Sequence, residues 1–450
     1  MAGFSDLCKE LVLEILRHVA PRDLGSACAV TKSISYLAAP ILAEHRRLKQ
    51  WFSSIDNFGD RDPALARFLI KILAKPRIAH YVRSLTVDSW GPVWEAITDN
   101  ARSPASTKSQ KSRCRSNNLQ LVRTALQKTQ IIRADEVDEW LQAIQHSTED
   151  HPILALLLLQ LPNLEDLEIS SIGMPIEYLS RTTQRIKNAP AGTYLSHLKH
   201  VSINIDTDWE DPDLMKIFDS FISLPSLASC CIEGLTIGNE ERDFEWHLRP
   251  HELNIVDLAF IHCNIGEKAL FEVLGCTKNL RSFTLTSLRS DSLSTRQLPD
   301  WYWLGVGLLH HAKQSLEKLI LLPQGTAYTE SCSLREFKVL REIDTELALF
   351  FNDPDSSVRG FPEMLPPSIR IVRLRPLTWP FMPSMRDVDV SRTLEQIREA
   401  ILSTLEVKDV LLPQLSEIHV FTGDDAPNNV FWDIPKACDA QGVLFSFSVR

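Results

Sequence analysis

The sequence predicts an α/β protein in which an N-terminal unit of three helices precedes an irregular repeat solenoid with a curved parallel sheet. Helical periodicity interrupted by prolines predicts the three helices in the first fifty residues. A six-residue phrase, apolar-x-x-apolar-x-apolar, recurs nine or ten times along the rest of the chain and predicts the solenoid. With 450 residues, 44% hydrophobic and 24% charged, the chain has ample material for a large core.

The first predicted helix, residues 7–20, has more apolar surface than packing on one core requires. At about 100° per residue, its apolar side chains cover an arc of roughly 200°. They are Leu11, Val12, Leu13, Ile15, Leu16 and Val19. A helix that packs on one core needs a stripe about half as wide. We therefore expect this helix to have a second contact surface.

Two more helices are predicted, over residues 23–30 and 32–52, the last bent at Pro40. A unit of this size, about 45 residues, buries too little surface to be comfortably stable alone. Its surplus apolar surface therefore indicates either a partner protein or a neighbouring domain of the same chain.

The residues of this unit resemble the F-box pattern, although Cys8 stands where the family usually has proline. The matching positions are Leu7, Glu10, Leu11, Ile15, Leu16, Asp23, Leu24, Val30, Thr31, Lys32, Ile34, Leu37, Pro40 and Leu42. The resemblance implies that residues 1–52 dock on a Skp-type adaptor, which links them to a cullin ubiquitin ligase. The implied adaptor contacts are Leu7, Cys8, Glu10, Leu11, Ile15, Leu16, Leu24, Val30 and Lys32. Alternatively, the helices simply cap the following domain.

The recurring phrase predicts an irregular leucine-rich-repeat-like domain over residues 53–450. Each phrase is expected to form a short strand with alternate residues facing inward, and helical stretches lie between the phrases. One copy meets the full leucine-rich-repeat consensus, with Ile255, Leu258, Phe260, Cys263 and Ile265. The combination is similar to fungal F-box proteins with leucine-rich-like repeats.

Strand residues between the buried ones are candidates for an exposed concave face that binds a target protein. They are Glu168, Ser202, Thr284, Arg373 and His419.

A polar interruption lies between the first and second strand phrases, at residues 100–118. It holds five Lys or Arg residues and no acid, and it is rich in serine. Such a composition predicts a disordered loop, with a nuclear-localisation or phosphorylation role as the alternative.

No catalytic motif is found, so we expect neither an enzyme nor a cofactor. His247 and His251 have the spacing of metal ligands on a helix, but Pro250 between them would break that helix, and we expect no metal site. The aromatic stretch at residues 301–303 is more typical of a repeat core than of a binding anchor.

The overall composition narrows the partners and the compartment. A formal charge of −10 argues against a nucleic-acid partner, and no apolar run is long enough for a membrane span. Nine scattered cysteines without a CxxC pair fit reduced thiols in the cytoplasm or nucleus. The predicted function is a substrate-recognition subunit of an SCF-type cullin ubiquitin ligase. The alternative is a protein-interaction scaffold unconnected to a ligase.

Overall fold

The structure is a computed structural model. It describes residues 7–57, 64–87, 108–146, 151–170, 176–190, 192–205, 212–237, 248–287, 301–322, 333–351, 358–375, 390–422 and 430–449. The chain divides into two compact units. Unit 1 comprises Met1–Ile203 and Asp213–Leu227, and unit 2 comprises Asn204–Pro212 and Ala228–Arg450. The predicted boundary after residue 52 stays a prediction, because the N-terminal helices group with the following elements in unit 1.

Unit 1 begins with a bundle of short helices and continues with parallel strands separated by helices. Its elements are α1 (Lys9–His18), α2 (Pro21–Ala29), α3 (Lys32–Leu37), α4 (Ala39–Phe52), β1 (Ser54–Asn57), α5 (Ala64–Ala74), the 3₁₀ helix η2 (Pro76–Tyr81), β2 (Ser84–Val87), α7 (Lys108–Lys128), η3 (Ala134–Glu136), α8 (Val137–His146), α9 (His151–Gln160), β3 (Asp166–Ile169), α10 (Glu177–Asn188), β4 (His200–Asn204) and α11 (Pro212–Ile222). The strands pair in the order β1-β2-β3-β4.

Unit 2 repeats the alternation of strand and helix. Its elements are β5 (Ser229–Glu233), β6 (Thr236–Ile237), β7 (Asp257–Ile265), α12 (Glu267–Cys276), β8 (Ser282–Ser287), α13 (Trp301–Ala312), β9 (Lys318–Leu322), β10 (Glu342–Glu346), η4 (Leu347–Phe350), η5 (Val358–Gly360), α14 (Phe361–Met364), β11 (Ile371–Arg375), α15 (Val390–Leu411), β12 (Glu417–Thr422), α16 (Ile434–Ala440) and β13 (Leu444–Val449). The strands pair in the order β5-β7-β8-β9-β10-β11-β12-β13, and β6 pairs with β7.

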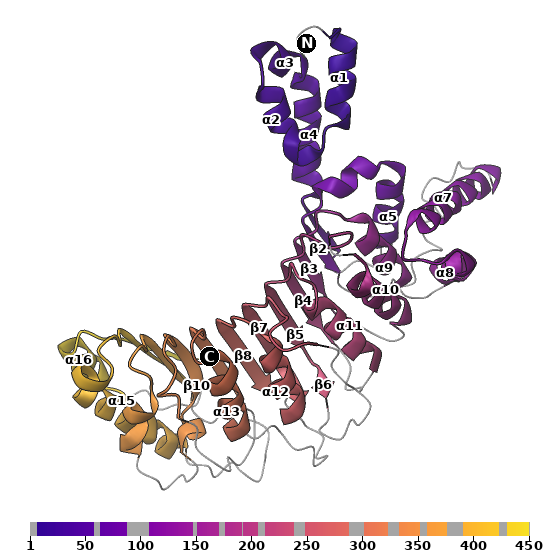
Figure 1. The fold of residues 1–450 in the computed structure, drawn as a ribbon. Coiled ribbons are helices and arrows are strands. Elements are labelled where there is room, and N and C mark those ends of the chain that lie inside the picture. The colour runs from indigo at the N-terminus through magenta and orange to yellow at the C-terminus, as the bar shows by residue number, and fades with distance from the viewer. Residues whose placement is uncertain are drawn as a thin grey trace. The chain divides into compact units, whose positions relative to one another are not determined.

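The predicted strands are confirmed, because every copy of the recurring phrase contains a strand and all described pairs are parallel. Alternate strand residues are buried, such as Leu258 and Phe260 in β7 or Val372 and Leu374 in β11. Helices lie along one side of the strands within each unit (Figure 1) and cover this buried face. The structure is therefore mixed α/β with parallel strands, as expected. Two short strands, β1 and β6, were not predicted.

Helix α9 accounts for the most apolar run of the sequence. His151 to Leu159 are all buried, so this helix is covered on every side. A helix that is apolar all round is stable in water only when it is enclosed in this way. Among the described residues, no helix combines the length and the apolar character that a membrane crossing requires.

The N-terminal helices differ from prediction in their boundaries. The third predicted helix is divided at Ala38 into α3 and α4, with Pro40 in the first turn of α4, where its missing N–H costs no helical hydrogen bond. Their own core consists of Val12, Leu16, Leu24, Cys28, Ile34 and Ala38. This core accounts for only one side of α1, which leaves its other apolar residues outside.

The prediction of a disordered loop at residues 100–118 is wrong from Lys108 onward, because α7 begins there. Residues 100–107 lie outside the described part of the chain. The C-terminal half of α7 buries Val122 and Leu126, which anchors the helix. Once a helix is nucleated, each further residue is fixed at small cost, and Lys, Arg and Gln are good helix formers. The composition of the polar segment alone therefore does not predict that α7 extends into it.

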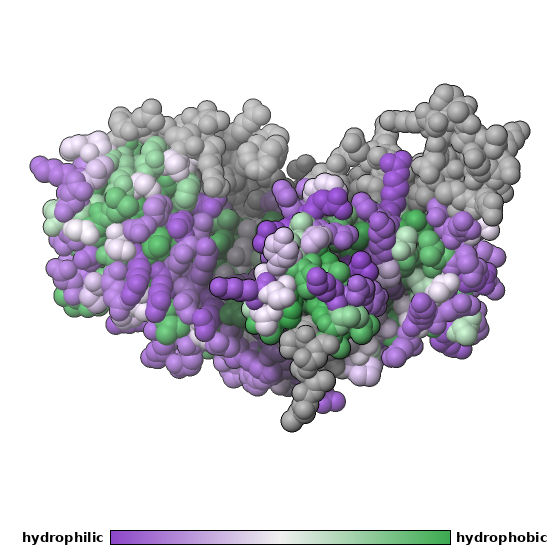
Figure 2. Space-filling model, turned by 90° about the horizontal axis from the view of Figure 1, so that it is seen from above, coloured by the Kyte–Doolittle hydropathy of each residue, from purple (hydrophilic) through white to green (hydrophobic). Residues whose placement is uncertain are grey.

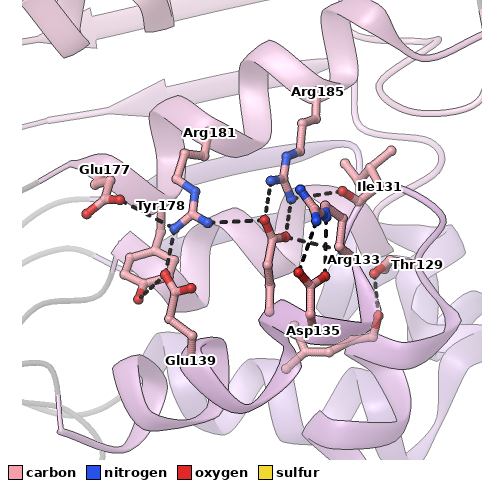
Figure 3. A network of polar contacts seen from close by, with 11 residues as sticks. Thr129, Ile131, Arg133, Asp135, Glu139, Glu177, Tyr178, Arg181 and Arg185 are labelled. Carbon is pink, nitrogen blue, oxygen red and sulfur yellow. Dashed lines mark hydrogen bonds and ion pairs between the residues drawn. The ribbon is translucent and has the colours of Figure 1, made fainter.

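An ion-pair network joins α10 to the segment before α8 (Figure 3). The two terminal guanidinium nitrogens of Arg185 donate to the carboxylate of Glu136 at 2.6 Å, and Arg181 lies 3.3 Å from the same group. Arg181 also donates to Glu139 at 2.6 Å. The hydrogen bonds from Arg185 are the main reason that the pKa of Glu136 falls to about 2. The network therefore holds η3 and α8 against α10.

Leu16→Ala is expected to lower the free energy of local unfolding of α1–α4 by about 2–5 kcal/mol, because it leaves a cavity in their core. Leu11→Ala, on the exposed side of the same helix, is expected to change it by less than about 0.5 kcal/mol. Hydrogen exchange of the amides in residues 7–52 measures both effects. Equal effects of the two substitutions would contradict the assignment of inner and outer faces.

Glu136→Gln is expected to cost about 2 kcal/mol of unfolding free energy near neutral pH, because a bidentate charged hydrogen bond is lost. Since the folded pKa lies below the ordinary 4.5, the wild-type contribution is complete above pH 4.5 and disappears as the pH falls toward 2. Denaturant titrations between these pH values should show the two proteins converging. Asp135→Asn, at an exposed carboxylate, is the control and should change little.

Candidate interaction surfaces

The outer face of α1 consists of Leu7, Leu11 and Ile15. Their side chains are 37%, 52% and 39% exposed. Residues four apart lie above one another along a helix, so Leu11 and Ile15 form a continuous apolar line that Leu7 extends beyond the first turn. Val12 and Leu16 point to the other side, into the core. The wide apolar arc of this helix is thus divided between a core face and a surface face.

Other predicted adaptor contacts also lie at the surface of this unit. Val30, directly after α2, is 69% exposed, and Cys8, Glu10 and Lys32 are exposed as well. For Leu16 and Leu24 the prediction is wrong, because their side chains are 1% and 0% exposed in the core. A sequence pattern does not separate apolar residues that a small unit needs for its own stability from those that it presents to a partner.

The polar side of α1 is neutralised within the helix. Glu14 lies 3.1 Å from Arg17 and 3.2 Å from His18, and hydrogen bonds from these two lower the pKa of Glu14. These three side chains pair with one another along the edge of the outer face, because Glu14 lies three residues after Leu11 and His18 three residues after Ile15. The exposed apolar line therefore has a polar border.

The strands of each unit present a second surface, formed by the residues that alternate with the buried ones. In unit 1, Glu168 and Ser202 are register neighbours on β3 and β4. In unit 2, Thr284, Arg373 and His419 lie in one register row, with Ile320 and Asp344 completing it. None of the five predicted residues is buried, and all five lie between buried strand residues. Their role in target binding stays a prediction.

The strand face of unit 2 has a charged part on β9–β12. Glu342 lies between Lys318, at 2.9 Å, and Arg373. Burial opposes ionisation of Glu342, but hydrogen bonds from these two cations hold its pKa below the ordinary value. Beside it, Arg375 donates two bonds of 2.8 Å to Asp344. The predicted contact residue Arg373 is thus already engaged within the fold.

His419 and Arg375 extend the charged part toward β13. His419 contacts Glu417 through Nε2 at 3.0 Å and Ser446 through Nδ1. The guanidinium of Arg375 lies 4.9 Å from the ring centre of Phe421, a distance suited to a cation–π contact. A partner that binds here must exchange these internal contacts for its own.

The neighbouring part of the same face, on β5–β9, is uncharged along its middle row. Cys231, Ala259, Thr284 and Ile320 follow one another in register. Small and apolar side chains allow the backbone of a partner to approach closely, whereas the charged part restricts which side chains can follow. The strand face of unit 2 therefore changes along the sheet, from an uncharged row on β5–β9 to a charged part on β9–β12.

An apolar groove lies between α12 and α13, with a volume of 240 Å³. Phe271 and Trp303 line it and are 41% and 52% exposed. On the face of the molecule seen in Figure 2, hydrophobic patches lie among hydrophilic residues. The interpretation of the aromatic stretch as core is therefore wrong for Trp303. A Cβ at Gly307 would lie 3.1 Å from the Phe271 ring, so glycine lets the two helices approach.

Metal ligands do not cluster in the part of the chain that the structure describes. No group of three potential ligands comes together among the described residues, and His247 lies outside them. Burial raises the pKa of Cys263 to about 12 and that of Cys230 further, so neither forms a thiolate readily.

No protein-family model matches the chain, and no curated protein matches it. Among solved structures, the chain is similar to one in a yeast complex of Rad7 and Elc1. The match is 14% identical, covers 62% of this chain and 69% of that one, and has a TM-score of 0.30. At this level the similarity carries no argument about function.

Asp344→Ala is expected to lower the unfolding free energy by about 2–3 kcal/mol, because Arg375 is left half-buried without its carboxylate. Removing Arg375 as well should recover part of the loss. Denaturant unfolding of both single variants and the double variant gives the coupling energy. Strictly additive effects would show that the pair does not organise the strand face.

Proposed function

We propose that the chain is a substrate-recognition subunit of an SCF-type cullin ubiquitin ligase. It binds a Skp-type adaptor through α1–α3 and a target protein through the strand faces of its repeats. The observation that carries the proposal is the exposed apolar line of Leu7, Leu11 and Ile15, on helices whose sequence resembles an F-box.

The contacts between these helices and the repeats support a separate docking role. His45 on α4 lies 3.0 Å from the hydroxyl of Tyr81, and Arg77 donates to the carbonyl oxygen of Arg17 at the C-terminal end of α1. These contacts join the bundle to η2 without using Leu11 or Ile15. Capping of the repeats therefore does not account for the outer face of α1, which is the observation that favours an adaptor over the scaffold function.

In this proposal the chain is not an enzyme and contributes proximity. The adaptor and cullin hold a charged ubiquitin-conjugating enzyme, and the repeats hold the target close to it. Bringing two reactants together raises their effective concentration and removes entropy cost from the transfer step. The chain itself then needs no nucleophile.

Leu11→Asp and Ile15→Asp are each expected to weaken binding to a Skp-type adaptor by about 30-fold or more, because a carboxylate is desolvated in an apolar interface. Isothermal titration calorimetry with purified adaptor measures the effect. Both side chains are exposed, so the thermal melting curve should stay close to wild type.

The matched control is Val410→Asp on α15, which places the same charge at an aliphatic side chain that is 82% exposed in the other unit. It should bind the adaptor like the wild type. If Leu11→Asp and Ile15→Asp variants with wild-type melting curves keep full affinity, the outer face of α1 is not the docking surface. If the wild type binds no adaptor, the scaffold function replaces the ligase.

A further inference from the structure

A strip of basic residues lies along unit 2 where the chain enters its strands. We name it the pre-strand rim and define it by the segments before β7–β11, at residues 248–256, 277–281, 313–317, 333–341 and 365–370. Its basic residues are Arg249, Lys278, Arg281, Lys313, Arg335, Lys338, Arg341 and Arg370. Its acidic residues are Glu252, Glu317 and Glu336. The rim has a formal charge of +5 in a chain whose total is −10, so its charge is segregated.

The rim is continuous, because parallel strands begin at the same edge of a sheet. Backbone hydrogen bonds join neighbouring segments: Glu317 donates to the carbonyl of Arg281 at 2.7 Å, Arg341 to Glu317 at 2.8 Å, and Arg370 to Arg341 at 2.8 Å. These four residues therefore form one row with the strand spacing of about 4.8 Å. Three of the four are arginines.

The cations of the rim are weakly neutralised, in contrast to those of the strand face. Arg281 and Arg341 are 57% and 51% exposed, and each approaches Glu317 at no less than 3.8 Å. Arg370 meets an uncharged amide, that of Gln414, at 3.5 Å. Lys313 pairs with Glu336 at 3.1 Å, whereas within the described ranges the side chains of Arg249, Arg335 and Lys338 form no ion pair. The guanidinium donors of this row are therefore available to an incoming anion.

We propose that the pre-strand rim binds an extended, carboxylate-rich segment of a partner protein. The planar fork of arginine matches a carboxylate, and Glu317 already shows a carboxylate accommodated between two rim arginines. Three carboxylates of the rim itself, Glu252, Glu317 and Glu336, interrupt the strip, so it matches a chain whose charges are separated by neutral residues better than an unbroken phosphate backbone. This interrupted pattern favours an acidic peptide over nucleic acid.

This inference goes beyond the proposed function and does not need the adaptor. The rim is in unit 2, whereas the outer face of α1 is in unit 1. A Leu11→Asp variant should therefore keep its affinity for an acidic peptide even though it loses the adaptor. The two proposals can fail separately.

The test uses the full chain and a fluorescein-labelled peptide of alternating Glu and Ser, with a Gln and Ser peptide of equal length for comparison. Fluorescence anisotropy at low ionic strength should show binding of the acidic peptide alone, weakening as added salt screens the charges. The double variant Arg341→Gln with Arg370→Gln should bind the acidic peptide about tenfold more weakly, since two charged contacts are lost.

The matched control is Lys268→Gln with Arg359→Gln, which removes two cations with exposed fractions of 80% and 79% from the helix side of unit 2. It should leave the affinity within about twofold, as expected for charges screened by solvent away from the site. Equal binding of the neutral peptide, or unchanged affinity of the rim variant, overturns the proposal. So does tighter binding of a single-stranded oligothymidine, which would assign the rim to nucleic acid.

Discussion

The parallel, in-register pairing of the strands is the constraint on which the rest of the structure depends. Because each phrase places its apolar residues at the same positions, pairing in register buries all of them on one face and aligns the residues between them in rows. Thr284, Arg373 and His419 share a row for this reason, although up to 135 residues separate them in sequence. A shift of one residue would exchange the core for the surface. Register therefore determines both the stability and the exposed surfaces of each unit.

The N-terminal helices meet a different constraint, since one short sequence must supply both a core and an exposed face. Leu16 and Leu24 are fully used inside, and Leu11 and Ile15 stay outside on the same or neighbouring helical turns. In a unit this small, each buried side chain is a large share of the total apolar burial. The N-terminal helices therefore tolerate an apolar outer face only because their inner core is complete without it. Contacts such as that of His45 with Tyr81 add support from the repeats.

The sequence was sufficient for features that depend on local periodicity and insufficient for those that depend on distant contacts. The strand phrases, their alternation and the surplus arc of α1 follow from residue spacing alone. The Glu136–Arg185 pair joins residues 49 apart, and no local pattern connects them. Helix α7 extends from an apolar half into a polar one, and composition assigned the polar half to a loop. The basic rim was also missed, because its residues are dispersed over five segments that only the parallel strands bring to one edge.

The two charged surfaces of unit 2 differ in how their charges are satisfied, and this difference determines what each can contribute to binding. On the strand face, Arg375 and Asp344 form two bonds of 2.8 Å, so a partner there replaces existing contacts and gains mainly from shape and specificity. On the rim, Arg341 is half exposed and 3.8 Å from its nearest carboxylate, so an acidic segment gains contacts without breaking strong ones. Exposed like charges also act over about one Debye length, roughly 10 Å at moderate salt, and speed the encounter with an oppositely charged partner. Recognition by unit 2 would therefore begin at the rim and be completed on the strand face.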